Sequence, residues 1–331
     1  MAGVGEKIRT VDYNSVQSKI AQVIGTGSGN FGWGQPFASS QVNDLNRITV
    51  NEWANLRNDI QTAHRHVTGS LPSIVEKNPG DTVRYSDAGT TPQQATEPVE
   101  QYDRWADFVI NNRFSVGAGR FITVDKNSRS RTFSGPLGGG GDVWSNRLEC
   151  TVTVSFSNAN NARWFFNSGG EIRLTSARTG GSSNAQNNSW TNLLNSAGTR
   201  IFGAQLPNAG FSPANGTNFW RLTTGYQTWY SVSASSPYTL NVYRIRARRN
   251  AASTQVQFLV EWIDGYIDPD TSTTDGSTYT NPFQNPPGDE VDGNISIAVS
   301  TKEATGPLIP SSLGNFSVQS PTVTYSNITG S

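Results

Sequence analysis

Apolar residues near the N-terminus recur at spacings of three and four, which predicts a short helix with one apolar face ending near residue 24. That face is formed by Val16, Ile20, Val23 and Ile24. Asp12 or Asn14 can cap the helix, because their side-chain oxygens can accept an orphan backbone N–H. A glycine-rich loop follows over residues 25–34. It carries Phe31 and Trp33, which we interpret as anchors against a neighbouring surface.

The clearest helix signal lies at residues 49–69. Thr49 and Glu52 can form a capping box, and Gly69 can end the helix. Between them runs an a/d seam formed by Trp53, Leu56, Ile60, Ala63 and Val67. About two heptads are too few for a stable isolated coiled coil. We therefore expect the seam to pack on the first helix, on the β domain or on the same helix of another subunit.

The next segments predict a change of domain. Residues 70–100 are rich in Pro, Thr, Gln and Asp and indicate an extended connector, and residues 102–110 indicate a third short helix. Tyr102, Trp105 and Val109 share one face of that helix. A glycine-rich turn or hinge is expected at residues 135–141. We assign residues 1–115 to a helical anchoring and oligomerisation region with its connector, and residues 116–331 to a β domain.

From residue 148 the hydrophobic period changes to two, which is the period of a half-buried strand. The first such strand is formed by Leu148, Cys150, Val152, Val154 and Phe156. Residues 162–166 and 172–176 predict a hairpin around 167–170, and further strands are expected near 222, 238–247, 256–262, 295–299, 316–318 and 323–325. Residues 189–194 predict a helix. The chain is therefore expected to be mainly β, with a C-terminal antiparallel β-sandwich or jelly roll preceded by a small helical arm.

Composition agrees with a β-rich protein that has long polar turns. Hydrophobic residues make up 34% of the chain and charged residues 15%, and the formal net charge is zero. No bulk field attracts nucleic acid or an anionic membrane, and no apolar run suggests a signal peptide or a membrane helix. We expect neither a nucleic-acid partner nor membrane insertion. The single cysteine, Cys150, excludes an internal disulfide and is compatible with assembly in a reducing cytoplasm.

Motifs for catalysis are missing from the sequence. His64 and His66, the two histidines, are two residues apart on a helix, so they point in nearly opposite directions and cannot ligate one ion together. We expect them on a solvated helix surface or in a subunit contact. Neither a Gly-x-Ser-x-Gly elbow nor a phosphate-binding loop occurs. We therefore expect no enzymatic activity and no cofactor.

An acidic loop is a weak metal candidate. Asp268, Asp270 and Asp275 lie in this loop, and the spacing of the first two resembles that of the first two ligands of a calcium loop. Thr273 and Tyr279, however, stand where glycine and glutamate are required. A polar hairpin tip is the alternative, so we assign no metal site.

Two further groups are candidates for binding. Arg244, Arg246 and Arg248 fall on one strand face, which indicates either a docking surface for an acidic neighbour or phosphate, or a solvated outer face. A second group, made of Trp220, Tyr226 and Trp229, lies among Asn, Thr and Gln residues. Such mixtures suit glycan binding when the rings line a surface groove, whereas buried rings indicate core.

Several strings of the sequence resemble a known family. These are YNSVQSKI (13–20), FGWGQ (31–35), WANLRNDI (53–60), ARWFFNSGGEIR (162–173) and TGGS (179–182), together with the pair Ser189 and Trp190. Over residues 12–300 the chain resembles virion structural proteins of contractile-tailed marine phages, especially cyanophages. The resemblance implies a location in the virion and carries no functional residues with it.

The function expected from these observations is that of a structural component of a tailed-phage virion, in the neck, tail or fibre. The helical arm would anchor the subunit, with assembly residues Phe31, Trp33, Trp53, Leu56, Ile60 and Ala63, and the β domain would be exposed or would tile. Its partners would be itself, as a homo-oligomer, and other virion proteins, after assembly in the host cytoplasm. The alternative is a recognition module that binds a host-surface glycan.

Overall fold

The computed structural model describes residues 9–26, 32–43, 48–79, 98–113, 121–134, 144, 146–203, 219–266, 291–304 and 320–330. The chain divides into two compact units. The helical unit contains Met1–Ile122, Ser157–Gly170 and Lys302–Ser320, and the β unit contains Thr123–Phe156, Glu171–Thr301 and Pro321–Ser331. The first division lies close to the predicted boundary at residues 115 and 116. The return of Ser157–Gly170 and Lys302–Ser320 to the helical unit was not predicted.

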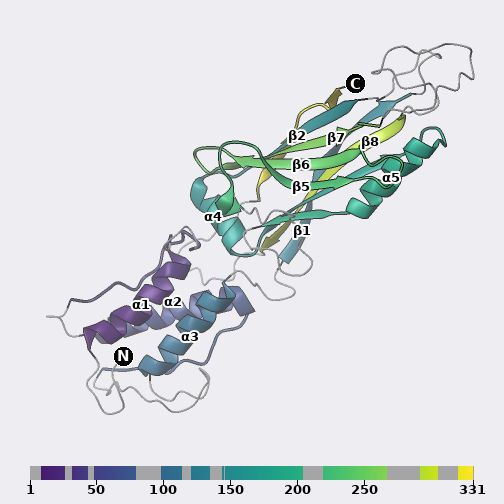
Figure 1. Cartoon of the computed structure of the whole chain (residues 1–331). Helices are drawn as coiled ribbons and strands as arrows, with labels where there is room; N and C mark the ends of the chain where they lie inside the picture. Colours follow the sequence, from purple (N-terminus) through teal and green to yellow (C-terminus); the bar gives the residue numbers. More distant parts are fainter. Residues whose placement is uncertain are drawn as a thin grey trace, which may run out of the picture. The chain divides into compact units, whose positions relative to one another are not determined.

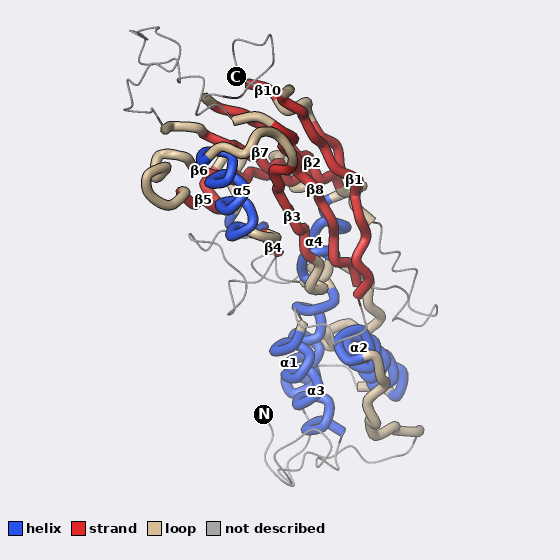
Figure 2. The backbone as a smooth tube through the Cα atoms, turned by 90° about the vertical axis from the view of Figure 1, so that its right-hand side faces the viewer, coloured by secondary structure: helices blue, strands red, loops and turns tan. Residues whose placement is uncertain are grey.

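Three helices lie side by side in the helical unit (Figures 1 and 2): α1 (Thr10–Ile24), α2 (Val50–Thr68) and α3 (Pro98–Asn112). Their predicted apolar faces are confirmed, since Val16, Leu56 and Tyr102 and their neighbours on those faces are buried in one core. In the described part of the chain no helix has the length and apolar character needed to cross a lipid bilayer.

The predicted cap of α1 is wrong by one turn. The helix begins at Thr10, and Arg9 occupies the N-cap position. Asp12 lies inside the first turn, where its carboxylate accepts the backbone N–H of Arg9 at 3.0 Å. The carboxamide of Asn14 instead bonds both the backbone N–H and the carbonyl of Val42, each at 2.9 Å. Asp12 therefore bonds the start of its own helix, whereas Asn14 holds the segment around Val42.

The local signals of α2 are all confirmed. Thr49 and Glu52 form the capping box, and Gly69 ends the helix in the left-handed region at φ 88°. The a/d seam packs against α1 and α3 of the same chain: the ring of Trp53 makes edge-to-face contacts with Tyr13 and Tyr102 at centroid distances of 5.2 and 5.5 Å. Of the surfaces expected for the seam, the structure shows the first helix, α1. The seam also packs on the third helix, α3, which was not among the expected surfaces.

Residues 162–166 are helical, so the predicted strand and its hairpin are wrong. They belong to α4 (Ala159–Asn167), whose N-cap Asn158 accepts the backbone N–H of Asn161 at 2.9 Å. The apparent alternation covered three residues only, and Phe165 between them is buried as well. A segment apolar on successive positions fits a short buried helix as well as a strand.

The strands form two sheets (Figure 2). One has the order β1-β8-β3-β4, with β1 (Phe121–Phe133), β8 (Gly293–Ala304), β3 (Glu171–Thr179) and β4 (Arg200–Gly203). The other has the order β10-β2-β7-β6-β5, with β10 (Thr329–Gly330), β2 (Arg147–Ser155), β7 (Gln255–Ile263), β6 (Val242–Arg249) and β5 (Gln227–Ser233), and β9 (Thr322–Tyr325) also pairs with β2. The register puts β2, β5, β6 and β7 antiparallel to their neighbours.

Side chains from the two sheets meet in the core of the β unit. Trp262 on β7 donates its indole N–H to the hydroxyl of Ser176 on β3 at 2.8 Å. Phe202 on β4 contacts Trp229 on β5 and Phe258 on β7, at centroid distances of 5.3 and 5.1 Å. The predicted period-two patterns of β2, β3, β7 and β8 are confirmed, because their apolar positions face this core.

Three details of the β unit differ from the prediction. Leu222 is buried but lies in a loop after the 3-10 turn η2 (Phe219–Arg221), not in a strand. The pattern gave no sign of β1, because exposed and half-exposed positions run along most of its length. The predicted helix at 189–194 exists and is longer, as α5 (Ala185–Ala197), which lies along the sheets (Figure 1).

Candidate functional site

The predicted assembly residues that the structure describes lie in the core of the helical unit. Trp33, Leu56, Ile60 and Ala63 are fully buried, and Trp53 nearly so. Phe31 lies outside the described residues. The neighbouring surface that Trp33 meets is α4: its indole N–H donates to the carbonyl of Asn167 at 3.0 Å, and its ring contacts Trp164. These residues can support assembly only by shaping the helical unit, since their side chains offer little outer surface.

The two histidines are buried, and the expectation of a solvated or intersubunit position is wrong. His64 lies against Trp105 and Phe108, and its Nδ1 is 2.8 Å from the carbonyl oxygen of Ser70. Burial lowers the pKa of His64 below its ordinary value, against a smaller opposing effect of that carbonyl. His66 packs between Trp33 and Trp164, with ring centroids 4.5 Å from each. Both histidines therefore serve the aromatic core.

The acidic loop with Asp268, Asp270 and Asp275 lies outside the described residues. Within the described ranges, no group of three or more His, Cys, Asp or Glu side chains is placed to hold a metal ion.

The three aromatic residues proposed for glycan binding do not line a common groove. Trp229 is 1% exposed and packs in the core against Phe202 and Phe258, so it is removed from that role. Trp220 and Tyr226 are half-buried. The ring of Tyr226 is covered by guanidinium groups, with the Arg248 carbon 4.4 Å and the Arg246 carbon 5.8 Å from its centroid.

The arginines predicted on one strand face are held by an acid within the chain. Glu261 on β7 is fully buried. Arg244 and Arg246 each donate from Nε at 2.8 Å and from Nη2 at 3.0 Å to its two carboxylate oxygens. Arg147 on β2 donates to the same carboxylate and, at 2.7 Å, to Glu149. Burial alone would raise the pKa of Glu261, but the hydrogen bonds from Arg244 and Arg246 hold it below its usual value.

A second buried ion pair joins Arg178 on β3 to Asp292, the residue before β8. Their Nη2 and Oδ1 atoms are 3.2 Å apart. The Asp292 carboxylate also accepts the backbone N–H of Ser182 at 2.9 Å and the amide of Asn187 at 2.6 Å. Burial alone would raise the pKa of Asp292, but these hydrogen bonds and the charge of Arg178 hold it below its usual value. A Cβ at Gly181 would lie 2.4 Å from Oδ1, so this close approach requires glycine.

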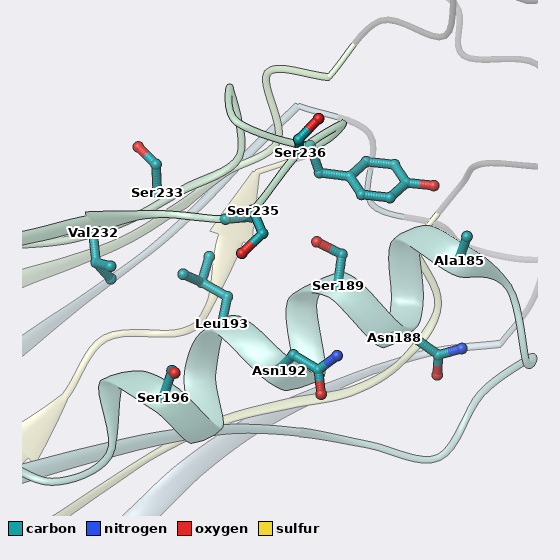
Figure 3. Close-up of a pocket in the computed structure, with 12 residues that line it drawn as sticks. Ala185, Asn188, Ser189, Asn192, Leu193, Ser196, Val232, Ser233, Ser235 and Ser236 are labelled. Carbon is teal, nitrogen blue, oxygen red and sulfur yellow. The ribbon is translucent and has the colours of Figure 1, made fainter.

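The candidate binding site is a cleft between α5 and the end of β5, which we call the α5–β5 cleft (Figure 3). Its volume is about 460 Å³. The lining contains two carboxamides and several hydroxyls around a small apolar floor: Asn188, Asn192, Ser189, Ser196, Ser233, Ser235 and Ser236, with Ala185, Leu193, Val232, Ala234 and Tyr238. No charged residue lines it. Such a surface offers hydrogen-bond donors and acceptors to a neutral ligand.

One face of α5 sets the geometry of the cleft. Ser189, Leu193 and Ser196 follow each other at spacings of four and three, so they lie on one side of the helix. In Figure 3, Ser189 and Leu193 project from the helix toward the segment that carries Ser235. The cap of the helix fixes its start, because Asn184 accepts the backbone N–H of Asn187 at 2.7 Å. Sequence reasoning found the helix but missed the cleft, because the other wall comes from a segment about forty residues away in the chain.

Comparison of the chain with protein-family models, with curated proteins and with solved structures finds no match.

Proposed function

We propose that the chain is a structural subunit of a tailed-phage virion, in which the helical unit attaches the subunit to the particle and the β unit is exposed or tiles. The observation that carries this proposal is the strand order of the β unit.

The strand order supports a β-sandwich related to the jelly roll. In an eight-stranded jelly roll one sheet has the order 1-8-3-6 and the other 2-7-4-5. Here the orders are β1-β8-β3-β4 and β10-β2-β7-β6-β5, and β9 also pairs with β2. Apart from the additional strands β9 and β10, the order differs from that of the jelly roll in that strands four and six have exchanged sheets. Jelly rolls are frequent in viral capsid proteins and in lectins. Both the virion role and the glycan-binding alternative are compatible with that fold.

The helical unit is built from segments that are far apart in the sequence. Its core contains Trp164 from α4, a segment that the chain inserts between β2 and β3. The two units are thus joined by several chain crossings rather than by one linker. Removing residues 1–70 would expose the apolar side of α4, so that truncation would not leave an undisturbed β unit.

The location is tested by purifying particles from infected cells and measuring the chain by mass spectrometry across a density gradient. We expect it to co-migrate with the major capsid protein at a constant ratio. Absence from gradient-purified particles would contradict the proposal.

Attachment through the helical unit is tested with two exposed positions. Val11 on α1 is 56% exposed, and Leu240 in the β unit is 62% exposed. Each is replaced by Cys and coupled to a bulky polyethylene glycol; the native Cys150 is buried. We expect the Val11→Cys conjugate to incorporate poorly and the Leu240→Cys conjugate normally. The reverse result would assign attachment to the β unit.

The second candidate function is recognition of a host-surface glycan, and the α5–β5 cleft is the observation that favours it. Its uncharged amides and hydroxyls suit the hydroxyls of a neutral saccharide, and its apolar floor suits a sugar C–H face. A glycan array followed by titration with the best ligand tests this. Asn192→Ala should weaken binding by about tenfold, whereas Asn195→Ala, exposed on the same helix outside the cleft, should not.

A further inference from the structure

The outer face of the six-stranded sheet carries a group of four arginines, three of which bond one buried acid, Glu261. We call Arg147, Arg244, Arg246 and Arg248 the arginine face; these residues come from β2 and β6, the two strands on either side of β7. The register places Arg244 directly opposite Glu261, and Glu261 directly opposite Glu149. Two carboxylates that face each other across a ladder repel, and Arg147 removes that repulsion by bonding both.

Glu261 acts as a positioning residue for the guanidinium groups. Because Arg244 and Arg246 both use their Nε and Nη2 edges on this one carboxylate, both guanidinium groups are held beside Glu261. Residues two apart on a strand share a face and lie about 7 Å apart. The two forks are therefore ordered before any ligand arrives, which removes part of the entropic cost of binding.

Each ordered guanidinium retains donors for a further acceptor. A guanidinium has five N–H groups, and among the described residues the Nη1 groups of Arg244 and Arg246 make no hydrogen bond. The side chains of Arg147, Arg244 and Arg246 remain 40%, 32% and 29% exposed. Arg248 bonds the neutral amide of Gln257 at 2.8 Å and lies over Tyr226. The arginine face has four arginines and, on the outward positions described, two carboxylates, Glu149 and Glu261. Its net charge is therefore plus two.

We infer that the arginine face binds the sulfate or carboxylate groups of an acidic polysaccharide. Planar or tetrahedral oxyanions match the fork of a guanidinium, which can bond them through two parallel N–H groups. Spaced arginines select for a ligand that repeats its charge, because a single small anion can satisfy only one or two of them.

The surroundings of the arginines favour a polysaccharide over other acidic polymers. The neighbouring outward positions on β2 and β7 include Thr151, Thr153 and Gln257, and two apolar ones, Leu259 opposite Arg246 and Ile263 opposite Arg147. The hydroxyls and the amide can bond sugar hydroxyls, and the two apolar side chains can contact sugar C–H groups. Single-stranded nucleic acid would need several free rings for stacking, and the ring that the described residues place beside these arginines, Tyr226, is already covered by them. The inference does not depend on the proposed virion location.

The first test measures binding of the full chain to immobilised dextran sulfate, with neutral dextran of the same length as control. We expect saturable binding to dextran sulfate that weakens with salt, weaker binding to carboxymethyl dextran, and none to neutral dextran. Equal or tighter binding to polyglutamate would assign the face to an acidic protein, and preference for an oligonucleotide would assign it to nucleic acid. Either result overturns the inference.

The second test separates ordered arginines from simple charge attraction. Glu261→Gln raises the net charge by one, so attraction by charge alone predicts tighter binding to dextran sulfate. Because the substitution loosens Arg244 and Arg246, we expect binding weaker by about threefold to tenfold instead. Unchanged or tighter binding, in a variant whose circular dichroism matches the wild type, would overturn the positioning argument.

A third test uses a residue that does not contact Glu261, so it can be carried out even if Glu261→Gln folds poorly. Arg248→Gln removes one cation of the face without breaking an ion pair, and we expect about threefold to tenfold weaker binding. Its control is Arg173→Gln, which removes the same charge from β3 in the other sheet, where Arg173 bonds Glu171. Equal losses in Arg248→Gln and Arg173→Gln would show non-specific attraction and contradict a site on the arginine face.

Discussion

Buried acids in the two units are held by different kinds of partner, as Asp59, Glu261 and Asp292 show. In the helical unit, Asp59 on α2 is fully buried and is held by the backbone N–H groups of Ala38 and Ser39, at 2.7 to 3.2 Å. Burial raises its pKa despite these hydrogen bonds. In the β unit, Glu261 and Asp292 are each bound by arginine, and the pKa of each lies below its usual value in spite of burial. Asp59 therefore holds a loop in place, whereas Glu261 and Asp292 order cations.

This difference indicates which acids stabilise the fold through their charge. The Asp59 carboxylate holds the loop after Trp33 by accepting the backbone N–H groups of Ala38 and Ser39. The oxygen of a neutral amide could accept some of these hydrogen bonds. Glu261 and Asp292 join strands that are far apart in the sequence, so neutralising them leaves arginines without partners. We therefore expect the β unit to depend on its acids, and the helical unit on its aromatic contacts.

The largest expected effect comes from Trp164→Ala in the helical unit. Trp164 is buried against Trp33 and His66, and removing so large a core side chain costs about 3–5 kcal/mol. Hydrogen exchange followed by mass spectrometry should show lost protection in α1 to α3, with β2 and β7 little changed. Lost protection in both units alike would indicate that they unfold together.

A matched pair of substitutions tests the contrast between the acids. Asp292→Asn breaks the pair with Arg178, which is 4% exposed, and should cost about 3 kcal/mol. Asp59→Asn keeps one oxygen for the backbone N–H groups of the loop and should cost about 1 kcal/mol. Urea denaturation measures both. Equal costs would remove the contrast.

Mild acid should affect the helical unit first. The folded pKa of His64 lies below its ordinary value of 6.5, so its contribution to stability is complete above pH 6.5 and is lost as the pH falls below it. Glu261 and Asp292, with lowered pKa values, lose their contributions only below their ordinary values of 4.5 and 3.8. Hydrogen exchange between pH 7 and 5, corrected for intrinsic rates, should show weaker protection in α2 and α3 alone. His64→Gln should remove that dependence; its persistence in the variant would assign it to another group.

The smallest expected effects come from the two asparagine caps. Asn158→Ala at α4 and Asn184→Ala at α5 should each cost about 1 kcal/mol. Each should lower protection only in its own unit. A neutral Asn158→Ala would argue against the helical conformation of residues 159–167.

Local signals predicted α2, β2 and β7, because a capping box, a seam and a period of two are each complete within one segment. They failed at α4, since the successive residues Trp164, Phe165 and Phe166 are all buried, which fits a helix as well as a strand. The cap at Asn158 and the contact with Trp33 favour the helix. At the arginine face the local signals placed Arg244, Arg246 and Arg248 on one side of a strand but missed Glu261. Glu261 is a single acid in an apolar strand, and its role depends on the register that places it opposite Arg244. Register and packing between distant segments cannot be read from a local pattern.

The most direct test of the proposed function is an electron cryo-microscopy reconstruction of purified particles. The account predicts density that fits the β unit in repeated copies, with the helical unit in contact with the rest of the particle. A reconstruction in which every protein is assigned and this chain is absent would contradict the account.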